Sequence, residues 1–435
     1  MRDMARKILT IASLAWALVA HAQVMPQVQL PGVPLPRLPV DPALRGIGDT
    51  VRALPTRAVR NQRLFDQHRA ELDRDPNGDL VVRAEVVAID ITEAALDQAK
   101  RADFLVKRTR ELSDLAVKIT VLQTPKGWTA RRGLAKLRKL DPAGTYDYNH
   151  VYLDNGDVRV GERAPSSVRA ADSPASGGGA GARVGLIDGG IDASHAALRG
   201  NALHESGCDG TRVASAHGTA VASLLAGSAA NFHGAAPRAE LYVAVVYCGS
   251  PTGGAIDTVA AAFGWMARER VPVINVSLVG PRNALLERAV RTLVTRGVII
   301  VAAVGNDGAA SPPLFPAAYD GVVAVTAVDA KHKVLLEACR GKHVRLSAPG
   351  AGIVAALAGS PDNYGAVRGT SFAAPIVAGL LASRLREADA AAAEKAIAAL
   401  TAQAIDLGSR GRDDIYGAGL VGDGVVAGEP GVPIK

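Results

Sequence analysis

The chain has 435 residues, of which 48% are hydrophobic and 21% charged, and its net charge at pH 7 is +7. This length allows two domains with buried cores, while three cysteines are too few for a small disulfide scaffold. The basic excess lies before residue 181, so the remainder lacks the basic cluster that a nucleic-acid-binding surface needs.

The N-terminus has the pattern of an export signal. Arg2, Arg6 and Lys7 precede an apolar run over residues 8–20, and residues 20–22 form the small-residue cleavage motif Ala-His-Ala. We therefore expect residues 1–22 to be a signal peptide that is removed on export. The apolar run is too short to span a bilayer comfortably, so we expect a secreted or periplasmic protein without a stable membrane anchor.

Residues 23–79 are predicted to be a tether and linker, because their first part is rich in proline, which favours an extended, polyproline-like chain. Residues 80–154 are predicted to form a small α+β domain of the ferredoxin-like order βαββαβ. The expected strands are 80–90, 104–109, 117–123 and 146–153, and the expected helices are 92–102 and 129–140. Residues 155–182, rich in Gly and Ser towards their end, are predicted to be a flexible processing linker.

Residues 183–435 are predicted to form an α/β domain with a doubly wound, mostly parallel sheet. Apolar runs rich in Val and Ile alternate with helical patterns, as in sheets that are buried on both faces. The expected strands are 184–187, 241–246, 273–276, 298–303 and 322–328, separated by helices such as 257–269 and 284–296.

Four polar residues stand at the ends of these elements. Asp188 and Asn306 follow predicted strands, and His217 and Ser371 open predicted helices. A serine nucleophile needs an imidazole to take its proton and a carboxylate to orient that imidazole, and an amide can donate to an oxyanion. We therefore expect Ser371 to be the nucleophile, His217 the general base, Asp188 its orienting group and Asn306 an oxyanion donor.

Each fragment alone has an ordinary structural explanation. Asp188 and Asn306 lie in turn-forming sequences, and Ser371 stands where serine often caps a helix. Their joint occurrence favours the catalytic interpretation. The order of the residues excludes an α/β-hydrolase, because Ser371 lacks the Gly-x-Ser-x-Gly motif and the acid precedes the serine.

The four motifs, at residues 184–188, 217–219, 305–306 and 369–375, resemble those of the subtilisin-like serine peptidases, and the resemblance covers residues 181–422. It implies an endopeptidase that hydrolyses polypeptides through an acyl-enzyme and needs no cofactor. It also implies a substrate-binding lining made by Ser277, Leu278, Val279, Gly280, Ala303 and Gly305. Relatives often have glycine at the position of Val279, so we expect a narrowed pocket that prefers small to medium apolar side chains. Asp307, near the rim, could instead attract a basic side chain.

The resemblance also gives the N-terminal region a role, because such enzymes commonly carry a βαββαβ propeptide that blocks the cleft. We expect residues 80–154 to be this intramolecular inhibitor, and a permanently attached accessory domain is the alternative. Two other functions stay open for the whole chain. One is a catalytically silent binding or regulatory protein, and the other is a self-limited protease that cuts only its own linker.

The family's second histidine is replaced by Ala220, which lies outside the expected triad. Many relatives bind calcium in a longer loop where this chain has residues 227–233, which lack carboxylates, so we expect no metal there. Export makes a disulfide plausible. Cys208 and Cys248 lie in turn-like sequences, and we expect them to pair and leave Cys339 free.

Overall fold

The computed structural model describes residues 57–154, 156–159, 179–230, 232–425 and 427–428. The predicted signal peptide, residues 1–22, lies outside the described residues, as does most of the predicted processing linker. No helix in the described part of the chain combines the length and hydrophobicity needed to cross a membrane.

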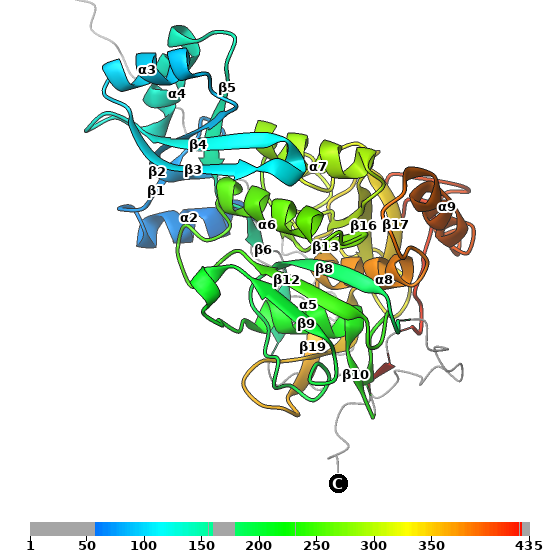
Figure 1. Ribbon diagram of the computed structural model, residues 1–435. Helices are drawn as coiled ribbons and strands as arrows, with labels where there is room; N and C mark the ends of the chain where they lie inside the picture. Colours follow the sequence, from blue (N-terminus) through cyan, green and yellow to red (C-terminus); the bar gives the residue numbers. More distant parts are fainter. Residues whose placement is uncertain (1–56, 155, 160–178, 231, 426, 429–435) are drawn as a thin grey trace, which may run out of the picture. The chain divides into compact units, whose positions relative to one another are not determined.

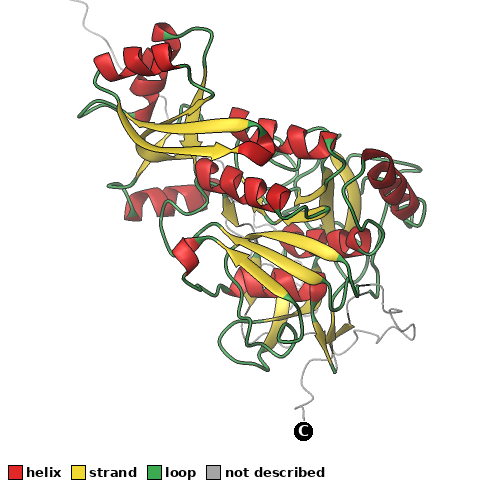
Figure 2. Ribbon diagram, viewed as in Figure 1, coloured by secondary structure: helices red, strands yellow, loops and turns green. Residues whose placement is uncertain are grey.

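A seven-stranded sheet lies at the centre of residues 179–425 (Figures 1 and 2). Across the sheet the strands are β17 (Val344–Pro349), β16 (Val323–Val328), β15 (Ile299–Ala303), β13 (Val273–Val276), β8 (Arg183–Asp188), β12 (Glu240–Val245) and β9 (Leu203–Ser206). Every neighbouring pair is parallel. From β8 the chain first forms the edge strand β9, then returns to β12 between β9 and β8, and then crosses to β13 on the other side of β8. A crevice is therefore expected where the strands end near β8 and β13. The predicted doubly wound parallel sheet is confirmed.

Helices cover both faces of this sheet (Figure 1). One face carries α5 (Ala216–Ala226) and α8 (Thr370–Ala382), and the other carries α6 (Ile256–Arg268) and α7 (Ala284–Thr295). In β15, Val301 packs into the first core and Ile300 into the second. Burial on both faces explains why the strands are continuously apolar rather than alternating. Helix α9 (Ala390–Thr401) completes this part of the fold.

The N-terminal region forms a five-stranded antiparallel sheet with two helices. Its elements are β1 (Leu72–Arg74), β2 (Leu80–Ile89), α3 (Glu93–Arg101), β3 (Leu105–Leu112), a 3-10 turn (Ser113–Leu115), β4 (Val117–Gln123), α4 (Ala130–Leu140) and β5 (Thr145–His150). Thr92 and Thr129 cap the two helices, each accepting a backbone N–H with its side chain. The expected βαββαβ order is present from β2 to β5.

Two elements lie where a tether and linker are expected. Helix α2 (Arg57–Gln67) and strand β1 fall within residues 23–79, after the proline-rich part. Only Asn61 of α2 is buried, and Leu64 and Phe65 pack partly buried against β1 and β2. The helix thus has too few apolar contacts for sequence periodicity to reveal it.

The remaining strands are β6 (Leu153–Asp154), β7 (Asp157–Arg159), β10 (Ser228–Ala229), β11 (Phe232–His233), β14 (Leu278–Val279), β18 (Ala351–Ala356), β19 (Tyr364–Arg368) and β20 (Ala427–Gly428). Within the described residues they form three smaller sheets, in the orders β14-β6, β18-β19-β7 and β10-β11-β20. Strand β7 falls within residues 155–182, where only a flexible linker is expected from composition.

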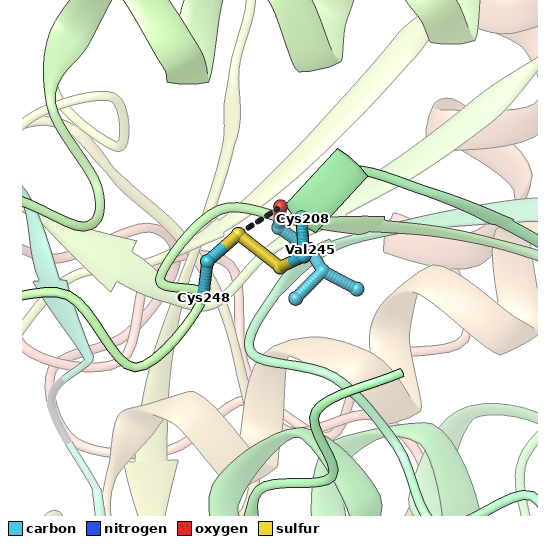
Figure 3. Close-up of a disulfide and its surroundings, with 3 residues drawn as sticks. All are labelled: Cys208, Val245 and Cys248. Carbon is cyan, nitrogen blue, oxygen red and sulfur yellow. Dashed lines mark hydrogen bonds between the residues drawn. A yellow bond between two sulfur atoms is a disulfide. The ribbon is translucent and has the colours of Figure 1, made fainter. Parts of the chain in front are cut away.

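Cys208 and Cys248 form a disulfide with their Cα atoms 5.2 Å apart (Figure 3). Cys208 follows β9 and Cys248 follows β12, so the bond ties the edge strand to its neighbour. Cys339 is a buried free thiol. The predicted pairing is confirmed.

Removing this disulfide should lower the free energy of unfolding. The two cysteines are 40 residues apart in the sequence, and chain-entropy arguments give about 4 kcal/mol for such a loop. Urea unfolding of Cys208→Ser/Cys248→Ser should show this loss, measured in a Ser371→Ala background to avoid self-digestion. The parent protein unfolded with a reductant is the control and should shift equally. An unchanged urea midpoint would contradict the expectation.

Candidate active site

Asp188, at the end of β8, and His217, in the first turn of α5, are in direct contact. Nδ1 of His217 lies 2.9 Å from Oδ1 of Asp188. Asp188 is fully buried and His217 is 6% exposed. The backbone N–H of Gly189 donates to the same carboxylate oxygen at 2.6 Å. An imidazole that donates through Nδ1 presents Nε2 as a proton acceptor, which is the tautomer a general base needs.

Local sequence explains why His217 reaches Asp188. Ser215 caps α5, its Oγ accepting the N–H of Gly218 at 2.9 Å. A Cβ at position 218 would lie 2.5 Å from the carbonyl oxygen of Gly189. Glycine at 218 therefore lets the first turn of α5 rest on the turn that follows β8, and this close approach sets the His–Asp distance.

The electrostatics of His217 follow from this pairing. Burial alone lowers the pKa of His217, but the charge and hydrogen bond of Asp188 outweigh burial and raise that pKa to about 9, with Asp154 adding to the effect. The protonated imidazole is therefore favoured at neutral pH while Asp154 is nearby. His217 can act as a base only after losing this proton, so base catalysis in this state increases as the pH rises towards 9.

Ser371 lies in the first turn of α8 and is fully buried. Its Oγ donates to the carbonyl oxygen of Ser277 at 3.4 Å, and Oγ of Ser277 donates to the carbonyl oxygen of Ser371 at 3.0 Å. The adjacent Phe372 ring packs on the His217 ring with 5.3 Å between centroids. Among the described residues, Nε2 of His217 has no hydrogen-bond partner. The hydroxyl of Ser371 thus points towards Ser277 in this structure, while the next residue of α8, Phe372, packs against His217.

Asn306 follows β15 and is held against the start of α8. Its Oδ1 accepts the N–H of Thr370 at 3.1 Å, and Oγ1 of Thr370 accepts the N–H of Gly305 at 3.2 Å. These two bonds fix the orientation of the amide beside a helix N-terminus, whose partial positive charge favours an anion. The geometry is suited to stabilising negative charge on an oxygen near Ser371.

The sequence-predicted lining residues surround the same place. Ser277 bonds with Ser371, as described, and Leu278 and Val279 form the fully buried strand β14. Ala303 ends β15, and Gly305 bonds to Thr370. Gly280 directly follows β14, and its N–H donates to the carbonyl oxygen of Phe315 at 3.0 Å. The structure therefore brings together all four candidate catalytic residues and the candidate lining.

The end of the N-terminal region runs through this site. Strand β6 pairs antiparallel with β14, placing Leu153 opposite Val279 and Asp154 opposite Leu278. Strand β7 then pairs antiparallel with β19. Gly156 lies between β6 and β7 in the sequence, and a Cβ atom added to it would lie 3.0 Å from Nε2 of His217. Strands of two and three residues carry no usable periodicity, so sequence patterns could not reveal this path.

Helix α2 was also missed by sequence reasoning, although it contacts the rim of the site. The backbone N–H of Arg57 donates to Oδ1 of Asp307 at 2.5 Å, and its Nε donates to Oδ2 at 3.2 Å. Nη1 of Arg60 donates to the carbonyl oxygen of Asp154 at 2.9 Å. Asp307, next to Asn306, thus holds the N-terminus of α2, and Arg60 holds the strand that enters the site.

A buried ion network adds a second contact between the N-terminal region and the large sheet domain. The guanidinium of Arg108 lies 2.8 Å from Glu85 and 2.6 Å from Asp257, the first acidic residue of α6. Glu85 and Asp257 are buried and share this arginine, and Lys107 is a second cation 2.6 Å from Glu85. In the described ranges, no group of three or more His, Cys, Asp or Glu side chains is arranged to hold a metal ion.

Comparisons with known proteins agree with this geometry. The model of the "Subtilase family" matches residues 179–419. An alkaline protease of Alkalihalobacillus alcalophilus is 32% identical over 292 residues, covering 65% of this chain and 74% of the relative. Subtilisin BL of Lederbergia lenta is 36% identical over 248 residues, covering 56% of this chain and 89% of the relative. The crystal structure of fervidolysin from Fervidobacterium pennivorans, a keratinolytic enzyme related to subtilisin, superposes with a TM-score of 0.65 at 20% identity. That match covers 79% of this chain but less than two thirds (61%) of fervidolysin, and it supports the fold.

Proposed function

The chain belongs to the subtilase family of serine endopeptidases, and from this premise we propose that it is an exported precursor that cuts itself and then hydrolyses other polypeptides. The observation that carries the proposal is the buried Asp188–His217 pair, with its 2.9 Å contact, beside Ser371 at the start of α8. Export is supported by the N-terminal sequence pattern and by the disulfide, which persists in oxidising compartments.

In the proposed mechanism, Ser371 attacks the carbonyl carbon of a peptide bond. His217 takes the serine proton at Nε2 and later gives it to the leaving amine, while Asp188 keeps the imidazole oriented. The side-chain amide of Asn306 and the backbone N–H of Ser371 hold the oxyanion at the N-terminus of α8. Water then hydrolyses the acyl-enzyme.

The substrate is proposed to bind as an added strand. Strand β14 accepts β6 in antiparallel register, and a substrate polypeptide can take the place of β6 after the N-terminal region leaves. Main-chain pairing of this kind binds polypeptides generally, and side chains along the strand then add selectivity.

The N-terminal region is proposed to be an intramolecular inhibitor. Three features support this proposal. Strand β6 pairs with β14 where a substrate strand would pair, α2 contacts the rim of the site at Asp307, and Arg108 forms an ion pair with Asp257 of α6. A protein that keeps this region attached would have its site filled, so activity requires its removal.

A time course on the purified full-length protein tests the proposed function. We expect hydrolysis of an unfolded protein substrate to begin after a lag, in step with loss of the N-terminal region. A silent binding protein would show neither event, and a self-limited protease would process itself without hydrolysing the added substrate. Full activity with residue 80 still attached would identify an accessory domain instead.

Replacing Arg60 by alanine should shorten the lag. Hydrogen bonds from charged donors contribute about 1.5–3 kcal/mol, so losing the bond to the Asp154 carbonyl should weaken inhibition roughly tenfold to a hundredfold. The measurement is the time at which activity appears for the full-length protein. Arg63→Ala, on an exposed position of the same helix, is the control and should match the parent. An unchanged lag in Arg60→Ala would argue against α2 as part of the inhibitor.

Replacing Val279 by glycine should broaden selectivity at the residue before the cut bond. Val279 is buried in β14, the strand proposed to bind the substrate backbone. In an occupied pocket, one extra carbon discriminates by about 10- to 200-fold. Profiling cleavage of a peptide library should show preference for small to medium apolar residues in the parent and gain of Phe and Tyr in the variant. Equal profiles would show that Val279 does not face the pocket.

A further inference from the structure

We propose that the first self-processing cut falls on the peptide bond whose nitrogen belongs to Gly156, so that the catalytic chain begins at Gly156. The inference rests on the proposed function, since it assumes that the chain processes itself. It assigns the cut to the start of residues 155–182, although the flexible composition that suggests processing lies at their end.

Two strand pairings bracket the bond. Up to Asp154 the chain is paired with β14, which follows Ser277, the partner of the Ser371 hydroxyl. From Asp157 it is paired with β19, whose last residue, Arg368, lies opposite Asp157. Strand β19 leads through Gly369 into α8 and Ser371. Only two sequence positions, 155 and 156, separate the two pairings, so we infer that the bond joining them is the one that Ser371 attacks.

Gly156 is in contact with the base that must protonate the leaving amine. A Cβ at this position would lie 3.0 Å from Nε2 of His217 and 2.6 Å from Cε2 of Phe372. Glycine therefore lets the backbone pass against the imidazole. In the proposed step, Oγ of Ser371 bonds to the carbonyl carbon before Gly156, and the serine proton moves to Nε2. The C–N bond then breaks, the Gly156 nitrogen takes that proton, and water hydrolyses the ester to release a carboxylate and restore Ser371.

Anchors on the acyl side hold the register. Tyr152 is fully buried, its N–H donates to Gly254 at 2.9 Å and its hydroxyl donates to the Pro281 carbonyl oxygen at 2.5 Å. A one-residue slip would move Tyr152 out of its site and turn each side chain to the other face.

The C-terminal end of the linker lies too far from the candidate catalytic residues for an intramolecular cut. Ala182 directly precedes β8, and its carbonyl oxygen accepts the N–H of Glu240 at 2.8 Å at the amino end of the sheet. Asp188 lies at the opposite end of β8, about 20 Å away at 3.3 Å per residue. Cutting near Ala182 would need a second enzyme molecule, so such a cut is secondary trimming.

The test is a time course of the full-length protein, in which the mass of the released N-terminal fragment gives its C-terminus and Edman sequencing gives the new N-terminus. We expect the first fragment to end at residue 155 and the catalytic chain to start at Gly156. The first-order rate constant of this cut should not change with protein concentration. A first fragment that ends within residues 160–182 would overturn the proposal while leaving self-processing intact. A Ser371→Ala protein that is cut as fast as the parent would instead overturn the proposed function.

Two further measurements make the test independent of one variant. Gly156→Val should slow the first cut at least about a hundredfold, because its side chain meets His217 and Phe372, whereas Gly177→Val should process normally. A peptide with the sequence of residues 149–160, added to the mature enzyme, should be cut before the glycine that corresponds to Gly156. Its Tyr152→Ala version should be cut about tenfold more slowly. Cleavage of the peptide at another bond, or normal processing of Gly156→Val, would contradict the assignment.

Discussion

Alanine in place of Ser371 should lower turnover about a millionfold and leave the full-length precursor uncut. Removing a serine nucleophile leaves only the oxyanion site and substrate binding to act on the reaction. Ser371 is fully buried at the start of α8, and replacing its Oγ by hydrogen should perturb the fold little. The measurements are the size of the purified precursor and the rate of peptide hydrolysis after added parent enzyme has removed the variant's N-terminal region and has itself been separated.

The control for this variant is Ser383→Ala, which changes a serine at the other end of the same helix. It should keep activity within a few-fold of the parent and process normally. If Ser371→Ala hydrolysed the peptide at a rate comparable with the parent, Ser371 would not be the nucleophile.

Asparagine in place of Asp188 should lower turnover about ten-thousandfold. Asparagine keeps the shape of the side chain but stabilises the wrong imidazole tautomer and cannot stabilise the imidazolium. The carboxylate of Asp188 is also what raises the pKa of His217 to about 9 against the effect of burial. Without it that pKa falls, so the residual activity should reach its plateau at lower pH than in the parent.

A full pH–rate profile checks both parts of this expectation. The parent should gain self-processing activity as the pH rises towards 9, because the imidazolium must lose its proton before it can act as a base. Asp362→Asn, at an exposed position, is the control and should leave the profile unchanged. If Asp188→Asn lost little activity and its rate rose over the same pH range as in the parent, the assigned role of Asp188 would be contradicted.

The sheet and the candidate catalytic residues could be predicted from sequence for physical reasons. Strands buried on both faces must be apolar throughout, so runs such as residues 273–276 are visible without structural information. The chemistry requires a carboxylate, an imidazole, a hydroxyl and an amide, and each stands in a recognisable motif at the end of an element. Cys208 and Cys248 also stand at element ends, which made their pairing predictable.

The inhibitory contacts could not be predicted, because they depend on residues far apart in the chain. Arg57 and Asp307 are 250 positions apart, and neither lies in a motif. Strands β6 and β7 exist because β14 and β19 pair with them, so their own sequences contain little strand signal. Helix α2 similarly combines long-range charged contacts with only two partly buried apolar side chains, Leu64 and Phe65.

Labelling with a fluorophosphonate, followed by peptide mapping, tests the central claim most directly. Such a reagent modifies only a serine that an adjacent base activates. The processed enzyme should be labelled on the peptide that contains Ser371, and the uncut precursor should be protected because β6 fills the site. Absence of label on the processed enzyme, or equal labelling of Ser371→Ala, would contradict the account.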